Sequence, residues 1–141
     1  MKLGIICDGI SRDLSYALNI MDEFELEYAE LQFVGDTEVG DHSAQEIKEI
    51  DLLLRDRGKP VSCLSRHIFA GMTTDNLAGD DLHTKHMDAL KRVIAMAHVV
   101  DSPLVRIMTP KKEQILWGSN GAEKWNVANG AWEKMLSLIA P

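Results

Sequence analysis

Cysteine is scarce in this sequence, and long apolar runs are missing from it. Cys7 and Cys63 are the two cysteines among 141 residues, and neither has other ligand residues at zinc-site spacing. Both fall in expected strands, so we interpret them as reduced core residues and not as a disulfide or metal site. No apolar run approaches the roughly 20 residues of a membrane span. Asp8 ends the first run too early for a signal peptide. We therefore expect a cytoplasmic protein without a membrane partner.

Basic residues are also fewer than acidic residues. The chain has 15 Lys and Arg residues against 22 Asp and Glu residues, which gives a formal net charge of −7. The two signs are interspersed, and no basic stripe is present that would bind a phosphate backbone, so we expect no nucleic-acid partner. Hydrophobic residues make up 45% and charged residues 26% of the chain, which is typical of a globular protein. The length favours a single domain over residues 1–141.

Short apolar segments alternate with amphipathic segments along the chain. The expected strands are residues 3–7, 29–34, 61–65 and 104–108. Helices are expected behind them, beginning near Ser11 or Asp13, at the capping-box sequence 43–46, near Leu82 and before Trp132. The buried face expected for the third helix consists of Leu82, His86, Leu90, Val93, Ile94 and Ala97. This alternation predicts an α/β fold with four sequential β/α units and parallel strands.

The pattern alone is compatible with a small doubly wound sheet or with half of an eightfold barrel, which needs about 250 residues when complete. Five segments carry a resemblance to a known family: Leu3–Asp8, Leu26–Leu31, Lys59–His67, Met87–His98 and Ser102–Met108. In their order and spacing they resemble the first strands and the third helix of the xylose-isomerase-like TIM barrels. This is the sugar phosphate isomerase/epimerase family, which also includes the endonuclease IV type. One departure is that Val100-Asp101 stands where the family usually has a glycine before the fourth strand.

The resemblance implies that the chain is the N-terminal half of a (β/α)8 barrel enzyme. Such enzymes use a divalent metal (Mn, Mg, Co or Zn) to isomerise or epimerise sugars by proton abstraction next to a carbonyl. In the family the metal ligands and the acid/base glutamates lie on strands five to eight, which this sequence does not reach. We therefore expect no metal site in this chain alone. The expected partners are a sugar or keto sugar and a missing C-terminal half or a second chain that completes the barrel.

Active sites of such barrels lie at the carboxyl ends of the strands, and His67 follows the third expected strand directly. A neutral imidazole can donate a hydrogen bond to a sugar hydroxyl or move a proton near neutral pH. We predict His67 as the catalytic residue of this half. The alternative interpretation is a loop histidine that caps a turn.

The predicted substrate-binding residues are Glu30, Gln32, Arg66, Arg106 and Trp117. Glu30 and Gln32 alternate with apolar neighbours and would face the barrel lumen, although an ion pair between Glu30 and Arg106 is an equally good interpretation of Glu30. Trp117 lies in a long loop and could stack on a sugar face. Asp8 is interpreted mainly as a turn and helix-capping residue.

Two further hypotheses remain open. The first is a non-enzymatic half-barrel module in which two copies close an eight-stranded barrel, because four strands leave two open edges. The second is a small doubly wound domain that binds a ligand where the strand order reverses. The strand order distinguishes the two architectures: 1-2-3-4 is expected for a half-barrel, and 2-1-3-4 for the doubly wound sheet.

Overall fold

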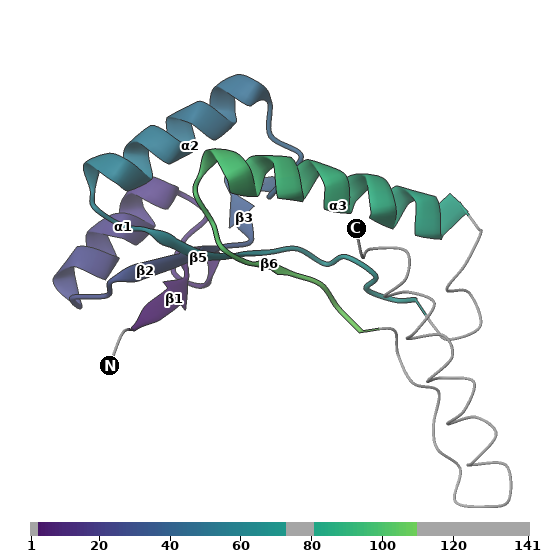
Figure 1. Cartoon of the computed structure of the whole chain (residues 1–141). Coiled ribbons are helices and arrows are strands. Elements are labelled where there is room, and N and C mark those ends of the chain that lie inside the picture. The colour runs from purple at the N-terminus through teal and green to yellow at the C-terminus, as the bar shows by residue number, and fades with distance from the viewer. Residues whose placement is uncertain (1–2, 73–80, 110–141) are drawn as a thin grey trace, which may run out of the picture. The chain divides into compact units, whose positions relative to one another are not determined.

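The computed structural model describes residues 3–72 and 81–109 of the chain (Figure 1). These residues fall into two compact units, one formed by 3–68 and 88–107 and the other by 69–72, 81–87 and 108–109. The helix expected around Trp132 and the loop that carries Trp117 lie outside the described residues. A single domain over residues 1–141 stays a prediction.

The first unit contains a four-stranded parallel sheet. Its strands are β1 (Gly4–Ile6), β2 (Tyr28–Leu31), β5 (Val61–Ser65) and β6 (Val105–Arg106), and their order is β1-β2-β5-β6. This confirms an α/β fold whose parallel strands follow one another in chain order. A doubly wound sheet is defined by a reversal of its strand order, and the order of these four strands contains no reversal. β5 has the predicted bounds, whereas β1 and β6 are shorter than predicted.

Two of the helices begin at the caps that the sequence indicates. Asp13 caps α1 (Leu14–Glu23), because its carboxylate accepts the backbone N–H of Tyr16 at 3.2 Å. Ser43 caps α2 (Ala44–Asp56): its hydroxyl accepts the N–H of Glu46, and the Glu46 carboxylate accepts the N–H of Ser43 at 2.7 Å. This capping box satisfies two backbone donors that would otherwise lack partners at the start of the helix.

The third helix, α3 (Asp81–Val99), buries Leu90, Val93 and Ala97 as predicted, but the rest of its buried set differs. Its buried residues are Ala89, Leu90, Val93, Met96 and Ala97. The predicted burial of Leu82 and Ile94 is wrong, since they are 39% and 42% exposed. Ile94 lies at the edge of a buried stripe that is centred near Val93 and Met96, and Leu82 lies in the first turn. No helix among the described residues is long and apolar enough to cross a membrane.

The strand predicted over residues 29–34 is also wrong in its extent. The parallel strand ends at Leu31, and Phe33–Val34 (β3) turns away to pair antiparallel with Thr37–Glu38 (β4). The two strands are joined by Gly35 and Asp36, and Gly35 has a φ of +61°. A glycine with positive φ at the first of two turn residues suits a tight β-hairpin. This hairpin, residues 33–38, is the main element that we did not predict.

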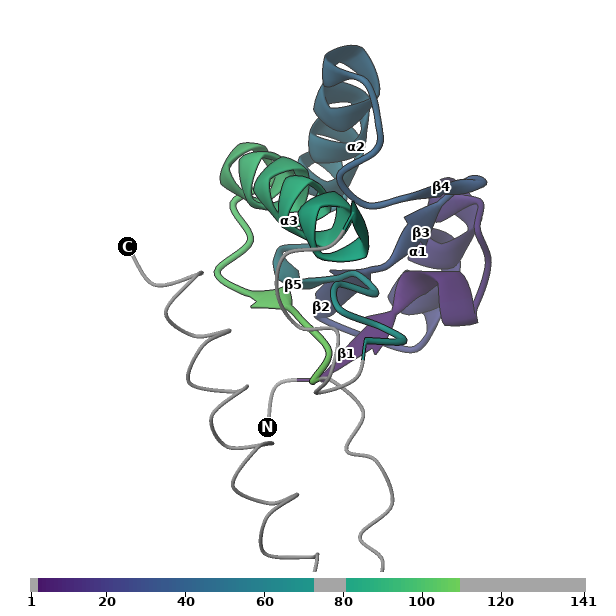
Figure 2. The ribbon, with the colours of Figure 1, turned by 90° about the vertical axis from the view of Figure 1, so that its right-hand side faces the viewer.

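The two faces of the parallel sheet differ in chemistry. Ala29, Leu31, Val61 and Leu64 lie on one face and are buried, and α1, α2 and the first unit's part of α3 lie on that side of the sheet (Figures 1 and 2). The strand register puts Glu30, Cys63, Ser65 and Arg106 on the other face. Three of these four residues are partly exposed. The sheet thus has an apolar face under the helices and a polar face opposite.

Candidate functional site

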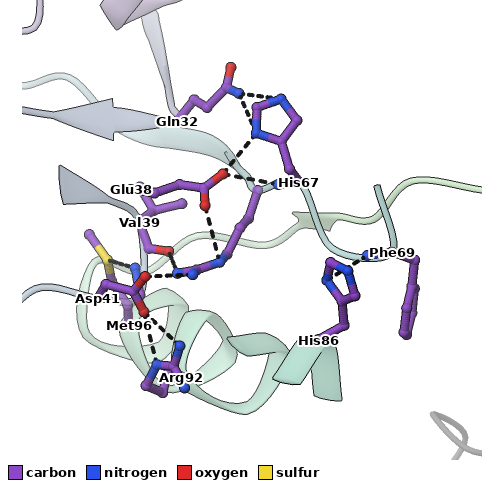
Figure 3. Close-up of polar contacts among 11 residues, drawn as sticks. Gln32, Glu38, Val39, Asp41, His67, Phe69, His86, Arg92 and Met96 are labelled. Atoms are coloured by element: carbon purple, nitrogen blue, oxygen red, sulfur yellow. Dashed lines mark hydrogen bonds and ion pairs between the residues drawn. The ribbon is translucent and has the colours of Figure 1, made fainter. Parts of the chain in front are cut away.

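The structure brings two predicted site residues together at the carboxyl ends of neighbouring strands. Gln32 follows β2, His67 lies two residues beyond β5, and β2 pairs with β5 in parallel. The side-chain amide nitrogen of Gln32 lies 3.2 Å from Nδ1 and 3.1 Å from Nε2 of the His67 ring (Figure 3). The His67 side chain is 48% exposed, so its ring is accessible from solvent. The parallel strand ends therefore bring these two side chains together.

Glu38 completes this group and was missed by the sequence analysis. Its Oε1 atom lies 2.9 Å from Nδ1 of His67 and also accepts the backbone N–H of His67 at 3.1 Å (Figure 3). Glu38 reaches this position because it ends β4 of the hairpin. The signal that could have found it is the Gly35-Asp36 pair, since a Gly-Asp dipeptide between two short strand segments is typical of a tight hairpin.

Arg66 lies directly before His67, but its guanidinium group points into the protein. Its side chain is only 9% exposed. It donates to the carbonyl oxygen of Val39 and to the carboxylate of Asp41, each at 2.5 Å, and its Nε lies 3.5 Å from Glu38 Oε2. The two terminal nitrogens thus donate hydrogen bonds, and Nε takes part in an ion pair. The geometry therefore favours a role in holding the hairpin, and the substrate contact proposed for Arg66 stays a prediction.

A second arginine extends this ion-pair network to α3. Arg92 contacts Asp41 Oδ1 through Nε at 2.9 Å and through a terminal nitrogen at 2.7 Å (Figure 3). The hydrogen bond from Arg66, together with Arg92, holds the pKa of the Asp41 carboxyl below its ordinary value. Asp41 therefore joins the chain segment after the hairpin both to Arg66 and to α3.

Glu30 and Arg106 form a separate pair on the polar face of the sheet. Their closest nitrogen–oxygen distance is 3.8 Å, and the Ser65 hydroxyl donates to the Glu30 carboxylate. The ion pair that we considered as an alternative for Glu30 is therefore present. Among the described residues the buried Nε of Arg106 has no hydrogen-bond partner, so the Arg106 side chain retains a donor. No hydrogen bond or ion pair of the described residues connects this pair to Gln32 and His67.

Asp8 is a turn residue, as we favoured, but it does not cap the following helix. It lies in the 3-10 turn η1 (Cys7–Gly9) at the end of β1, and α1 is capped by Asp13 instead. Its Oδ1 atom is buried and accepts no hydrogen bond within the described part of the chain. Asp8 is therefore a further buried acceptor at the carboxyl end of the sheet.

The described residues do not fit the divalent metal that the family resemblance implies. Within residues 3–72 and 81–109 there is no group of three or more His, Cys, Asp or Glu side chains that could hold a metal ion. A divalent metal would have to take its ligands from outside these residues.

No known protein-family model matches the chain, and no curated protein matches it. The positions of Gln32, Glu38 and His67 nevertheless indicate which chemistry this group can perform. Gln32 offers an amide that can donate and accept, Glu38 and His67 form a carboxylate–imidazole pair, and the His67 ring is accessible. Such a set can bind hydroxyl groups and can move a proton near neutral pH.

Proposed function

We propose that the chain is the N-terminal half of a metal-dependent sugar isomerase or epimerase that acts by proton abstraction next to a carbonyl. The observation that carries this proposal is the placement of His67 beside Gln32 and Glu38, at the carboxyl ends of β2 and β5. In parallel α/β barrels, catalytic and binding residues come from this end of the strands. The family resemblance supplies the reaction class, and the geometry supplies the residues of this half.

The architecture supports a half-barrel. Its parallel strands follow chain order, and its helices lie on one side of the sheet, as right-handed crossovers require when every connection joins neighbouring strands. In a closed barrel the opposite face becomes the interior, and here that face carries Glu30, Ser65 and Arg106. The second half would come from a continuation of the chain or from a second chain.

The proposed reaction removes a proton from the carbon next to the carbonyl. The C–H electron pair moves into a new carbon–carbon double bond, the carbonyl oxygen takes up the negative charge, and a proton returns to either carbon. Gln32, Glu30 and Arg106 would bind the hydroxyl groups of the sugar. His67 would donate a hydrogen bond to a hydroxyl or move a proton between oxygens. The divalent metal and the main acid and base would be contributed by the other half.

Solvent deuterium tests this function directly. The chain, assembled with the other half of its barrel and supplied with Mn²⁺ or Mg²⁺, is incubated with a panel of ketoses and aldoses in D₂O. Proton NMR should show deuterium entering the carbon next to the carbonyl of at least one sugar. His67→Ala should slow this exchange, and the matched control His98→Ala, which removes an exposed histidine of α3, should not. Absence of exchange with every sugar in the assembled barrel would refute the proposal.

The kinetic constants separate two roles of His67. If His67 contacts the substrate only in the transition state, His67→Ala lowers kcat with little change in KM, whereas loss of a simple binding contact raises KM. Unchanged values of both constants would mean that His67 is a loop residue without a role in the reaction.

One observation favours the second candidate, a non-enzymatic half-barrel module. In the described sheet β1 and β6 each pair on one side only, and open strand edges invite pairing with another chain. Two copies related by a twofold axis could close an eight-stranded barrel. Light scattering on the full chain should then give the mass of a dimer, and no sugar should undergo exchange in D₂O.

A further inference from the structure

The ring of His67 is oriented through its Nδ1 atom. Glu38 Oε1 lies 2.9 Å from Nδ1, and the same oxygen accepts the His67 backbone N–H at 3.1 Å. An ionised carboxylate has no proton to donate. The hydrogen of this contact must therefore belong to Nδ1, which leaves the Nε2 atom of a neutral ring with a free electron pair.

Gln32 does not occupy that electron pair. Its amide nitrogen is nearly equidistant from the two ring nitrogens, at 3.2 Å from Nδ1 and 3.1 Å from Nε2. The electron pair of Nε2 points outward in the plane of the ring, so a donor aligned with it would be much farther from Nδ1. The amide instead lies against the ring between its two nitrogens, as Figure 3 shows. Within residues 3–72 and 81–109, Nε2 therefore remains available to a ligand.

The carboxylate of Glu38 is itself held by Arg66. Its second oxygen, Oε2, lies 3.5 Å from Nε of the buried Arg66. Arg66 in turn is fixed by the Val39 carbonyl and by Asp41 on the segment that follows β4. Because Glu38 and these two partners belong to residues 38–41, Arg66 holds one short segment at three points. The carboxylate that orients His67 is consequently supported by a network of hydrogen bonds and ion pairs behind it.

We propose that Glu38 is a positioning residue, which fixes His67 as the tautomer with hydrogen on Nδ1 and presents Nε2 as the acceptor for a substrate hydroxyl. When Nε2 takes a hydroxyl proton, the O–H bond breaks, its electron pair stays on oxygen and the ring becomes an imidazolium. Its Nδ1–H then remains hydrogen-bonded to the Glu38 carboxylate. The nature of the substrate rests on the proposed function, but the state of the ring does not.

The tautomer can be measured without substrate. Histidine labelled with ¹⁵N is incorporated into the full chain, and long-range proton–nitrogen NMR spectra distinguish Nδ1–H from Nε2–H rings. The His67 signals are assigned by their loss in His67→Gln. In the unmodified chain His67 should be the Nδ1–H tautomer, in contrast to histidines in free solution, which favour Nε2–H. A predominantly Nε2–H ring for His67 would overturn the inference at once.

Two variants test whether Glu38 causes the Nδ1–H tautomer of His67. Glu38→Ala removes the acceptor, so the ring should change to mainly Nε2–H. If this variant does not fold, Glu38→Gln provides the test. The glutamine amide can donate a hydrogen bond to Nδ1 as well as accept one from it, so the fraction of His67 in the Nδ1–H form should fall. The control is Asp36→Asn, which removes one charge from the same hairpin at a side chain that is 99% exposed. A tautomer that stays unchanged in the folded Glu38 variant would refute the role of Glu38.

A kinetic measurement links the tautomer to the reaction. In the assembled enzyme Glu38→Gln should lower kcat by about tenfold or more with little change in KM, because it disturbs an orienting contact and not the bound sugar. Unchanged kcat together with a changed tautomer would refute a role of the orientation in turnover. If no form of the protein exchanges deuterium with any sugar while the tautomer follows Glu38 as expected, the proposed function fails and the positioning of His67 stands.

Discussion

Gly40 lies against the backbone of Val93 on α3. A Cβ atom at Gly40 would stand 2.8 Å from the Val93 nitrogen and 2.9 Å from its Cα, and the glycine has a φ of +90°. Its backbone N–H also points to the Met96 sulfur at 3.3 Å. Gly40 stands between Val39 and Asp41, the two residues that hold Arg66. Close packing of Gly40 on the helix thus fixes the segment on which the site depends.

Gly40→Ala should therefore destabilise the protein. The methyl group meets helix backbone that cannot move aside, and the backbone conformation is unfavourable for alanine, so we expect a loss on the order of 2 to 4 kcal/mol. Gly9→Ala is the matched control, because a Cβ at Gly9 meets nothing within 4 Å, and its effect should stay within about 0.5 kcal/mol. Urea unfolding of both variants provides the comparison. Equal stability of the two variants would contradict the close packing.

Arg66→Met tests the buried guanidinium group. Methionine keeps much of the apolar stem, so the change removes mainly the contacts with Val39, Asp41 and Glu38. Breaking such a buried set leaves acceptors without a partner, and we expect a loss on the order of 2 to 4 kcal/mol in the free energy of unfolding. The control Arg55→Met removes an exposed i,i+4 pair with Asp51 and should cost no more than about 0.5 kcal/mol. A similar effect of both changes would argue against the supporting role of Arg66.

The pH dependence of stability should contain a contribution from Asp41. Hydrogen bonds from Arg66 and Arg92 hold its pKa in the folded protein below the ordinary value of 3.8. The carboxylate therefore stabilises the fold fully above pH 3.8, and this contribution is lost as the pH falls through the lower folded value.

The difference in unfolding free energy between the unmodified chain and Asp41→Asn should consequently be constant near neutral pH and shrink below pH 3.8. Urea unfolding at several pH values measures it. Asp36→Asn is the control with the same change in charge, because the Asp36 side chain is 99% exposed. A difference for Asp41→Asn that grows in acid would contradict the ion-pair geometry.

Local signals in the sequence were sufficient for most of the fold. Asp13 and the Ser43–Glu46 capping box mark the helix starts because they act within one turn of the backbone. β5 was predicted with its correct bounds, since an apolar segment enclosed by Pro60 and a polar loop permits few alternatives. The strand order was expected from the family resemblance together with right-handed crossovers between successive strands, because the pattern alone also permitted the doubly wound order.

The hairpin could not be found in the same way. β3 and β4 have two residues each, which is too short for a periodic pattern, and Phe33 and Val34 continue the apolar alternation of β2. Missing the hairpin also meant missing Glu38, the partner of His67. The inward position of Arg66 depends on Asp41 and on Arg92, which are 25 and 26 residues away in the chain, and such pairing is set by tertiary structure. The sequence indicated that Gln32 and His67 lie near strand ends, but it did not predict their contact.

The two cysteines should differ in reactivity, and the difference can report on barrel completion. Cys7 is 1% exposed, and burial together with the charges of Asp8 and Glu30 raises the pKa of its thiol to about 12. Cys63 lies beside Glu30 on the polar face and is partly exposed. Because the thiolate is the reacting species, Cys63 should react with iodoacetamide at least about tenfold faster than Cys7. Mass spectrometry of the labelled peptides measures both rates.

Completion of the barrel would cover the polar face of the sheet. The second half, whether it is a continuation of the chain or another copy, should then protect Cys63 while Cys7 stays unreactive. In guanidinium chloride both cysteines should react at similar rates, which controls for intrinsic differences between the two peptides. A Cys63 that reacts equally fast in the isolated chain and in the assembled protein would contradict an interior position of this face, and with it the half-barrel proposal, because the side chains of a barrel interior are packed away from solvent.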